Sequence, residues 1–411
     1  MTGTVIAGEL VTGRRLTQVP VSDLSWSVEH RGATRIDVTI PLAAEALQTL
    51  DRSSWGLYPS SDLFLPFYPT PERWVYEPSG RMRPEFLASL EPWRCFLAVV
   101  VDGAVIAAGP IQPHAYDPAT RSLKVSAVGM DAVFARRQVI GPEAEWPGGN
   151  PAAWSATFTG SLGTIAKRLI EVGLAAPGGA LPLVLPADEP GDHTRTYHGF
   201  EQGWVWERIT QIMSVESGPD VRFNPRFQAD LKGVEWVLEV GTDAAPMLTQ
   251  TGAPWVFDAR AVRGSVAGMS VDRDPSGMCS RAFVSGEGME TSLLVERATN
   301  PELTANGFPA LDAVEARSTV SDRGTLASHA AARARRNSRP YVTWGLRVKA
   351  DQYPRLGQYR EGDFARVWVP TDDPYLSALL PAGQHTARIV RFSGDATDNV
   401  RVEFAPVLES R

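Results

Sequence analysis

The segment that most constrains the fold is residues 97–111, which read LAVVVDGAVIAAGPI. Two apolar runs flank Asp102 and Gly103. An Asp-Gly pair in this setting favours a two-residue type I′ turn, because both central residues of that turn need positive φ. The segment therefore predicts a tight β-hairpin. Its strands carry no side chain suited to acid–base or nucleophilic chemistry, so we expect the hairpin to serve as scaffold.

Short strands and turns are predicted along most of the chain. Alternation of polar and apolar residues predicts strands at 24–30, 34–40 and 122–128, the first two joined by a turn at Arg31-Gly32. The 36 glycines and 32 prolines favour short strands over long helices. Apolar spacing and capping residues predict helices at 161–174 and 202–218, and alanine-rich composition predicts another at 324–339.

These patterns predict a β-rich α+β fold with two small antiparallel β-barrel-like domains and helical or mixed inserts. The expected divisions are an N-terminal barrel-like domain over 1–140, a helical insert over 141–225, a mixed β domain over 226–320, and a helix plus C-terminal barrel-like domain over 321–411. A chain of 411 residues with 43% hydrophobic composition is long enough for several such cores.

A proline-rich and aromatic-rich insertion interrupts the N-terminal domain at residues 55–86. Its prolines exclude a long regular element. We interpret the segment as a contact element for a partner chain, and a carbohydrate-binding platform is the alternative. The candidate contact residues are Trp55, Tyr58, Phe64, Phe67, Tyr68, Trp74 and Tyr76.

Charge and cysteine content exclude several classes of protein. The formal net charge is −7, the opposite of the sign expected for a protein that grips nucleic acid. The two cysteines, Cys95 and Cys279, are typical of a reducing cytoplasm rather than a disulfide framework. The N-terminus lacks the pattern of a signal peptide, and no apolar run approaches the roughly 20 residues that span a bilayer. We expect no membrane insertion by this chain.

The sequence contains no specific catalytic or metal-binding motif. His193 and His198 have no evident third ligand nearby, and residues 272–283 place Phe283 where a calcium loop needs a glutamate. The arginines at 333–339 are expected on a solvated helix face. We therefore expect no catalytic residue, metal or cofactor, and the protein is not expected to be an enzyme. A carbohydrate-binding or carbohydrate-active β-rich protein remains the alternative.

The order of elements resembles the tail hub, or baseplate hub, proteins of long-tailed, non-contractile bacteriophages that infect actinobacteria. No single motif is specific, and the resemblance extends over nearly the whole chain. The segments that carry it are WRCFLAVVVDGAVIAAGPI (93–111), LKVSAVGMDAVFARR (123–137), GPDVRFNPRF (218–227) and YVTWGLRVKADQYPRLGQYREGDFARVWV (341–369). Only four of the 40 basic residues are lysine, which suits a host with a GC-rich genome.

The resemblance implies a structural virion component at the tail tip, made in the host bacterial cytoplasm. Three chains with two barrels each would form a ring with pseudo-sixfold symmetry, matched to a hexameric tail tube. The implied partners are other copies of the chain, the distal tail protein, the tape measure protein and the tip or fibre proteins. DNA would pass without specific binding, through a lumen that we expect to be neutral or acidic.

Overall fold

The computed structural model describes residues 3–49, 71–215, 217–260, 266–288, 290–317, 322–369, 374–379 and 382–406. The chain divides into two compact units. A main unit comprises Met1–Met269 and Leu346–Arg411, and a small unit comprises Ser270–Gly345. None of the described helices is long and apolar enough to cross a bilayer.

One large, mostly antiparallel sheet organises the main unit. Its strand order includes β18-β21-β20-β3-β4-β7-β6-β5-β1-β2, with β19 paired to β20 and to β13. The strands are β1 (Thr4–Glu9), β2 (Arg15–Val19), β3 (Asp23–Glu29), β4 (Arg35–Pro41), β5 (Cys95–Val101), β6 (Ala104–Asp117), β7 (Ser122–Val128), β13 (Trp255–Asp258), β19 (Phe364–Val369), β20 (Gly383–Asp395) and β21 (Asn399–Pro406), with β14 (Val266–Asp274) and β18 (Tyr341–Lys349) crossing the unit boundary. The predicted β-rich α+β class is confirmed.

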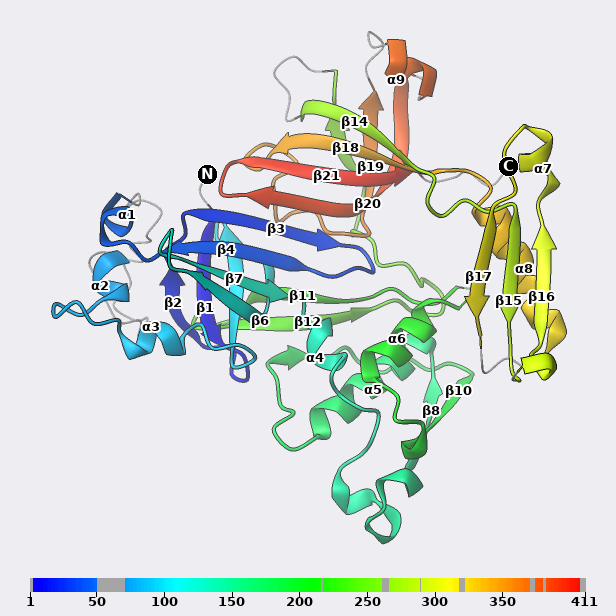
Figure 1. Ribbon diagram of the computed structural model, residues 1–411, viewed down its shortest axis with the longest axis horizontal. Coiled ribbons are helices and arrows are strands. Elements are labelled where there is room, and N and C mark those ends of the chain that lie inside the picture. The colour runs from blue at the N-terminus through cyan, green and yellow to red at the C-terminus, as the bar shows by residue number, and fades with distance from the viewer. Residues whose placement is uncertain are drawn as a thin grey trace. The chain divides into compact units, whose positions relative to one another are not determined.

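Strands from the two ends of the chain meet in this sheet. Strand β3 pairs antiparallel with β20, in a register that places Glu29 opposite Arg391 and Ser25 opposite Asp395. In Figure 1 the blue strands β3 and β4 lie beside the red strands β20 and β21. The N-terminal and C-terminal strands are thus hydrogen-bonded into one sheet.

The predicted hairpin forms as strands β5 and β6. Asp102 and Gly103 have φ of 49° and 78°, as a type I′ turn requires. Every residue of β5 is buried, which explains why its sequence is continuously apolar rather than alternating. Phe96 packs edge-on against Trp236, with ring centroids 5.4 Å apart.

The segment after β7 packs on this hairpin rather than forming a core of its own. Phe96 of β5, Ile165 of α5 and Trp236 of β12 belong to one buried cluster. The boundary expected at 140/141 therefore separates no cores, and the boundary at 225/226 falls inside β11. The elements are α4 (Asp131–Phe134), β8 (Ser155–Gly160), α5 (Leu162–Ala175), β9 (Leu183–Val184), β10 (His193–His198), α6 (Val205–Met213), β11 (Val221–Phe227) and β12 (Val234–Val240).

The small unit is a three-stranded sheet covered by the predicted alanine-rich helix. The strand order of this sheet is β16-β15-β17. The buried residues of the helix α8 are Leu326, Ala330 and Ala334. They pack against residues of β15 such as Ala282 and Val284. The boundary expected at 320/321 thus cuts one compact unit. Its elements are β15 (Arg281–Ser285), β16 (Val295–Thr299), α7 (Pro301–Ala305), β17 (Asp312–Ala316) and α8 (Arg323–Arg336).

Several short elements complete the described structure. The remaining α-helices are α1 (Ala44–Thr49), α2 (Pro71–Val75), α3 (Pro84–Ala88) and α9 (Pro374–Leu379), and 3₁₀ turns occur at Glu143–Glu145, Pro147–Gly149, Pro151–Ala153, Gly199–Glu201 and Glu290–Ser292.

Candidate functional site

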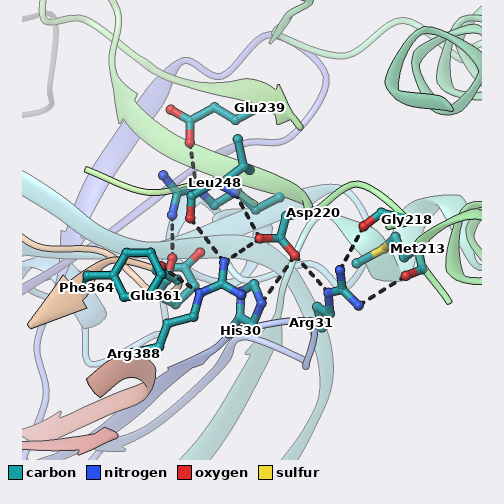
Figure 2. Close-up of polar contacts among 12 residues, drawn as sticks. His30, Arg31, Met213, Gly218, Asp220, Glu239, Leu248, Glu361, Phe364 and Arg388 are labelled. Atoms are coloured by element: carbon teal, nitrogen blue, oxygen red, sulfur yellow. Dashed lines mark hydrogen bonds and ion pairs between the residues drawn. The ribbon is translucent and has the colours of Figure 1, made fainter. Parts of the chain in front are cut away.

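A buried carboxylate, Asp220, gathers three basic side chains from distant parts of the main unit. His30 and Arg31 lie in the turn between β3 and β4, Asp220 lies just before β11, and Arg388 lies on β20. We call these four residues the Asp220 cluster (Figure 2). They bring the N-terminal strands, the middle segment and the C-terminal strands to one point.

Both oxygens of Asp220 are engaged. Oδ1 accepts from Arg31 Nε at 2.8 Å and lies 3.3 Å from His30 Nε2. Oδ2 accepts from Arg388 Nη2 at 2.5 Å and from the Leu248 backbone N–H at 2.9 Å. Only 2% of the Asp220 side chain is exposed, so this carboxylate is held almost wholly by protein donors.

The arginines extend the cluster to backbone carbonyls. Arg31 donates to the carbonyls of Met213 and Gly218, at the end of α6 and in the loop that follows. Arg388 donates to the carbonyls of Gly362 and Leu248. The carbonyl groups at a helix end need donors, and Arg31 supplies one from another part of the chain.

A second set of charges lies beside the cluster. Arg222 of β11 donates to Glu239 of β12 and to the backbone carbonyl of Glu361. Asp363, in the turn that precedes β19, accepts from Trp255 Nε1 at 3.0 Å. Burial raises the pKa of Glu361 despite the opposing charge of Arg222, and burial likewise raises the pKa of Asp363 despite its hydrogen bond from Trp255.

The electrostatics of Asp220 suit a structural clamp. Burial alone would raise the pKa of this carboxyl group. The hydrogen bond and charge of His30, together with Arg388, outweigh that effect and hold the pKa well below its ordinary value. A carboxylate that is saturated with donors and stays ionised is a poor general base. The arrangement can fix three chain segments together.

The cavity beside the cluster is small. It has a volume of about 50 Å³ and is lined by Asp220, Asp131 and Trp206 among others. That volume holds a few water molecules, whereas sites for small organic ligands are typically about 300–1,000 Å³. The cavity is therefore too small for a substrate.

The other candidate residues do not assemble into a reactive site. His193 Nε2 lies 3.6 Å from Asp243, while His198 stacks on the Phe200 ring. Within the described ranges, no group of three His, Cys, Asp or Glu side chains is placed to hold a metal ion. Arg333 of the arginine cluster pairs with Glu315 inside the small unit.

The structure describes two of the seven aromatic residues proposed for partner contact. Trp74 is 2% exposed and packs edge-on against Phe86, so it stabilises the main unit and is not presented on its surface. Tyr76 is half-buried and donates from its hydroxyl to the Leu42 carbonyl at 2.7 Å. The other five lie outside the described residues: Trp55, Tyr58, Phe64, Phe67 and Tyr68.

Sequence reasoning missed the Asp220 cluster because its members are far apart in the chain. Arg31 and Arg388 lie 189 and 168 positions from Asp220. Two local signals were available: an aspartate in a Gly-Pro-Asp turn after a helix, and an arginine in a β-turn. Neither signal identifies its partner without the fold.

The chain is similar in fold to solved phage tail proteins. The 43 kDa tail protein of prophage MuSo2 from Shewanella oneidensis has a TM-score of 0.51 and 10% identity, with 98% of each chain covered. A tail protein from Neisseria meningitidis has a TM-score of 0.48 and 12% identity, with 98% of this chain and 96% of that chain covered. Prophage tail protein gp18 from Listeria monocytogenes has a TM-score of 0.43 and 12% identity, with 99% and 95% covered.

No protein-family model matches the sequence, and no curated protein matches it significantly. The likeness to the Shewanella prophage protein, which extends over both chains, shows that this chain has the fold of a phage tail protein.

Proposed function

We propose that this protein is the tail hub of a long-tailed, non-contractile phage of an actinobacterium. Three copies would form a ring at the distal end of the tail, between the tail tube and the tip or fibre proteins. The shared fold with a prophage tail protein over 98% of both chains carries this proposal. The excess of arginine over lysine supports the choice of host.

The described geometry supports a structural rather than a catalytic role. The buried carboxylate of Asp220 is saturated, and the cavity beside it is too small for a substrate. The β3–β20 ladder joins both ends of the chain into one sheet, which suits a rigid ring segment that must keep its shape while DNA passes.

The purified protein is expected to assemble into trimers, alone or with its tail partners. Identical subunits that contact one another through unlike surfaces form a closed ring when the rotation from one subunit to the next completes a full circle. A ring of three copies matches the symmetry of a hexameric tube if each copy presents two similar parts to the tube. Mass photometry should show a species of three times the 44.6 kDa chain mass. Monomers alone in solution, together with density lacking threefold symmetry at the tip of assembled particles, would contradict the proposal.

Removing part of the aromatic insertion is expected to block assembly and leave the main unit folded. The deletion should span residues 55–70, because Trp74 and Phe86 are buried and contribute to the core. We expect the main unit to keep its free energy of unfolding within about 1 kcal/mol, because the deletion retains the buried side chains of Trp74 and Phe86. Mass photometry and urea denaturation on the same sample report the two properties.

A core substitution provides the matched control for this deletion. Trp74→Ala should lower the free energy of unfolding by about 3–5 kcal/mol. If particles with the 55–70 deletion assembled normally, the insertion would not be a contact element.

A further inference from the structure

A shallow groove lies on the large sheet where β3 meets β20. Its volume is about 450 Å³, and short side chains lie along its middle: Ser25 and Ser27 on β3, and Ser393 on β20. Ser27 and Ser393 are directly opposite each other in the ladder. Neighbouring strands carry longer side chains, with Arg35 of β4 opposite Ser27 and Arg401 of β21 opposite Ser393. Figure 1 shows these four strands adjacent in the sheet.

The groove carries an excess of positive charge in an acidic protein. Its lining contains the arginines Arg35, Arg347, Arg391 and Arg401 and the aspartates Asp37 and Asp395. Four positive and two negative groups leave an excess of two positive charges. Because the chain as a whole has a net charge of −7, the remainder of the chain has a net charge of −9.

Three of the arginines have side chains that make no hydrogen bond or ion pair with any residue that the structure describes: Arg35, Arg347 and Arg391. Arg35 and Arg347 are exposed, and Arg391 is half-buried with its Nε enclosed. By contrast, Arg401 pairs with Glu403 at 2.8 Å, and Asp37 accepts from Ser126. The groove therefore presents three available guanidinium groups above a floor of serine hydroxyls.

Carboxylates are the anions that fit this site best. A guanidinium group binds a carboxylate through two parallel N–H donors, and the serine hydroxyls supply further donors. Duplex DNA is a poorer match, because it carries about one negative charge per 1.7 Å along its axis and the protein around the groove is acidic, whereas a carboxylate side chain brings only one negative charge.

We propose that this groove receives carboxylate side chains from a neighbouring copy of the chain. The inference rests on the proposed ring. Outside the groove the chain has 45 acidic and 36 basic residues, so each copy carries an excess of the carboxylates that the groove would bind. The contact joins unlike surfaces, the groove of one copy and carboxylates of the next, as a ring of identical subunits requires.

Neutralising the groove tests this contact. The triple variant Arg35→Gln, Arg347→Gln and Arg391→Gln should weaken association by roughly a hundredfold, as expected when interfacial charge pairs are lost. A matched variant with the same change in charge replaces three exposed arginines elsewhere, Arg94→Gln, Arg195→Gln and Arg297→Gln, and should associate like the wild type. Mass photometry over a concentration series gives the association constants, and circular dichroism verifies that both variants fold.

Chemical coupling identifies the acidic group. In the variant Arg35→Lys and Arg391→Lys the charge is retained, so assembly should persist, and a carbodiimide can join each new amine to a nearby carboxylate. We mix ¹⁵N-labelled and unlabelled chains before coupling. A contact between copies should then yield cross-linked peptide pairs in which one peptide carries ¹⁵N and the other does not. Mass spectrometry then names the acidic residue.

Four results would overturn the proposal. Unchanged assembly of the triple variant would reject the groove contact and leave the ring intact. Cross-links found only within single chains would likewise reject the groove contact and leave the ring intact. Binding of a short DNA duplex that the triple variant abolishes would assign the groove to nucleic acid. Wild-type protein that never associates, alone or with tail partners, would reject both the ring and this contact.

Discussion

Replacing Asp220 by alanine is expected to lower the free energy of unfolding by about 3–5 kcal/mol, the range found when one member of a buried ion pair is removed. The substitution leaves Arg388 and His30, which are largely buried, without their carboxylate, and it removes the acceptor of the Leu248 N–H. Urea denaturation of the variant and the wild type measures the difference.

An exposed aspartate provides the control for this experiment. Asp188 pairs with Lys167 and Arg168, yet 41% of its side chain is exposed. Asp188→Ala is expected to change stability little, because exposed ion pairs are screened by water. Equal effects of the two substitutions would contradict the view that Asp220 clamps the main unit.

The effect of Asp220 should depend on pH in a defined direction. Its pKa is lower in the folded chain than in the unfolded chain, so its contribution is fully present above the ordinary aspartate value of about 3.9. The contribution is lost as the pH falls below that value toward the folded pKa. The stability difference between the wild type and Asp220→Ala should therefore shrink as the pH falls below about 4.

The raised pKa values of Glu361 and Asp363 act in the opposite sense, since the folded chain holds their protons more tightly than the unfolded chain does. Their contribution makes the protein less stable as the pH rises above the ordinary range of these groups. Both the variant and the wild type contain Glu361 and Asp363. Subtracting the variant's stability profile against pH from that of the wild type therefore cancels the contribution of these two groups and leaves that of Asp220, provided that the sites do not interact.

Gly109→Ala is expected to destabilise the protein by about 3 kcal/mol or more, at the upper end of overpacking effects. Gly109 lies on β6, and a Cβ atom there would come within 1.6 Å of the Val128 carbonyl oxygen. The obstructing atom is backbone, so relief requires β6 and β7 to move apart. Thermal or urea denaturation measures the loss.

The turn of the same hairpin offers a control with a different mechanism. Gly103 has a φ of 78°, but a Cβ atom there would meet nothing within 4 Å. Gly103→Ala should destabilise by about 1–2 kcal/mol, the energy of placing an L-residue in the left-handed region. If Gly109→Ala were no more harmful than Gly103→Ala, close packing between β6 and β7 would not constrain this position.

Local features were predictable from sequence where local chemistry determines them. The Asp102-Gly103 turn and the capped helices α5 and α8 follow from a few neighbouring residues. Ser161 and Asp322 accept from backbone N–H groups three residues later, as the positions of these polar residues before apolar or alanine-rich segments indicate.

The long-range arrangement was not predictable from the same patterns. Alternation in β3 and β20 identifies two strands, but it does not say that Ser27 faces Ser393. Likewise, nothing local to Asp220 indicates that it will be buried against Arg388. The expected domain boundaries at 140/141, 225/226 and 320/321 differ from the compact units for this reason: composition marks where turns occur, whereas shared cores decide which segments fold together.

The β3–β20 ladder also has a consequence for synthesis of the protein on the ribosome. Residues 25–29 are made early, and their partners 391–395 are made only 362 to 370 residues later. Until then the backbone N–H and C=O groups along that edge of β3 have no strand to pair with. Unpaired edges bind other strands readily, so the nascent chain exposes an aggregation-prone edge throughout its production. Slow translation of the middle segment would lengthen that exposure, and a chaperone that covers β3 would shorten it.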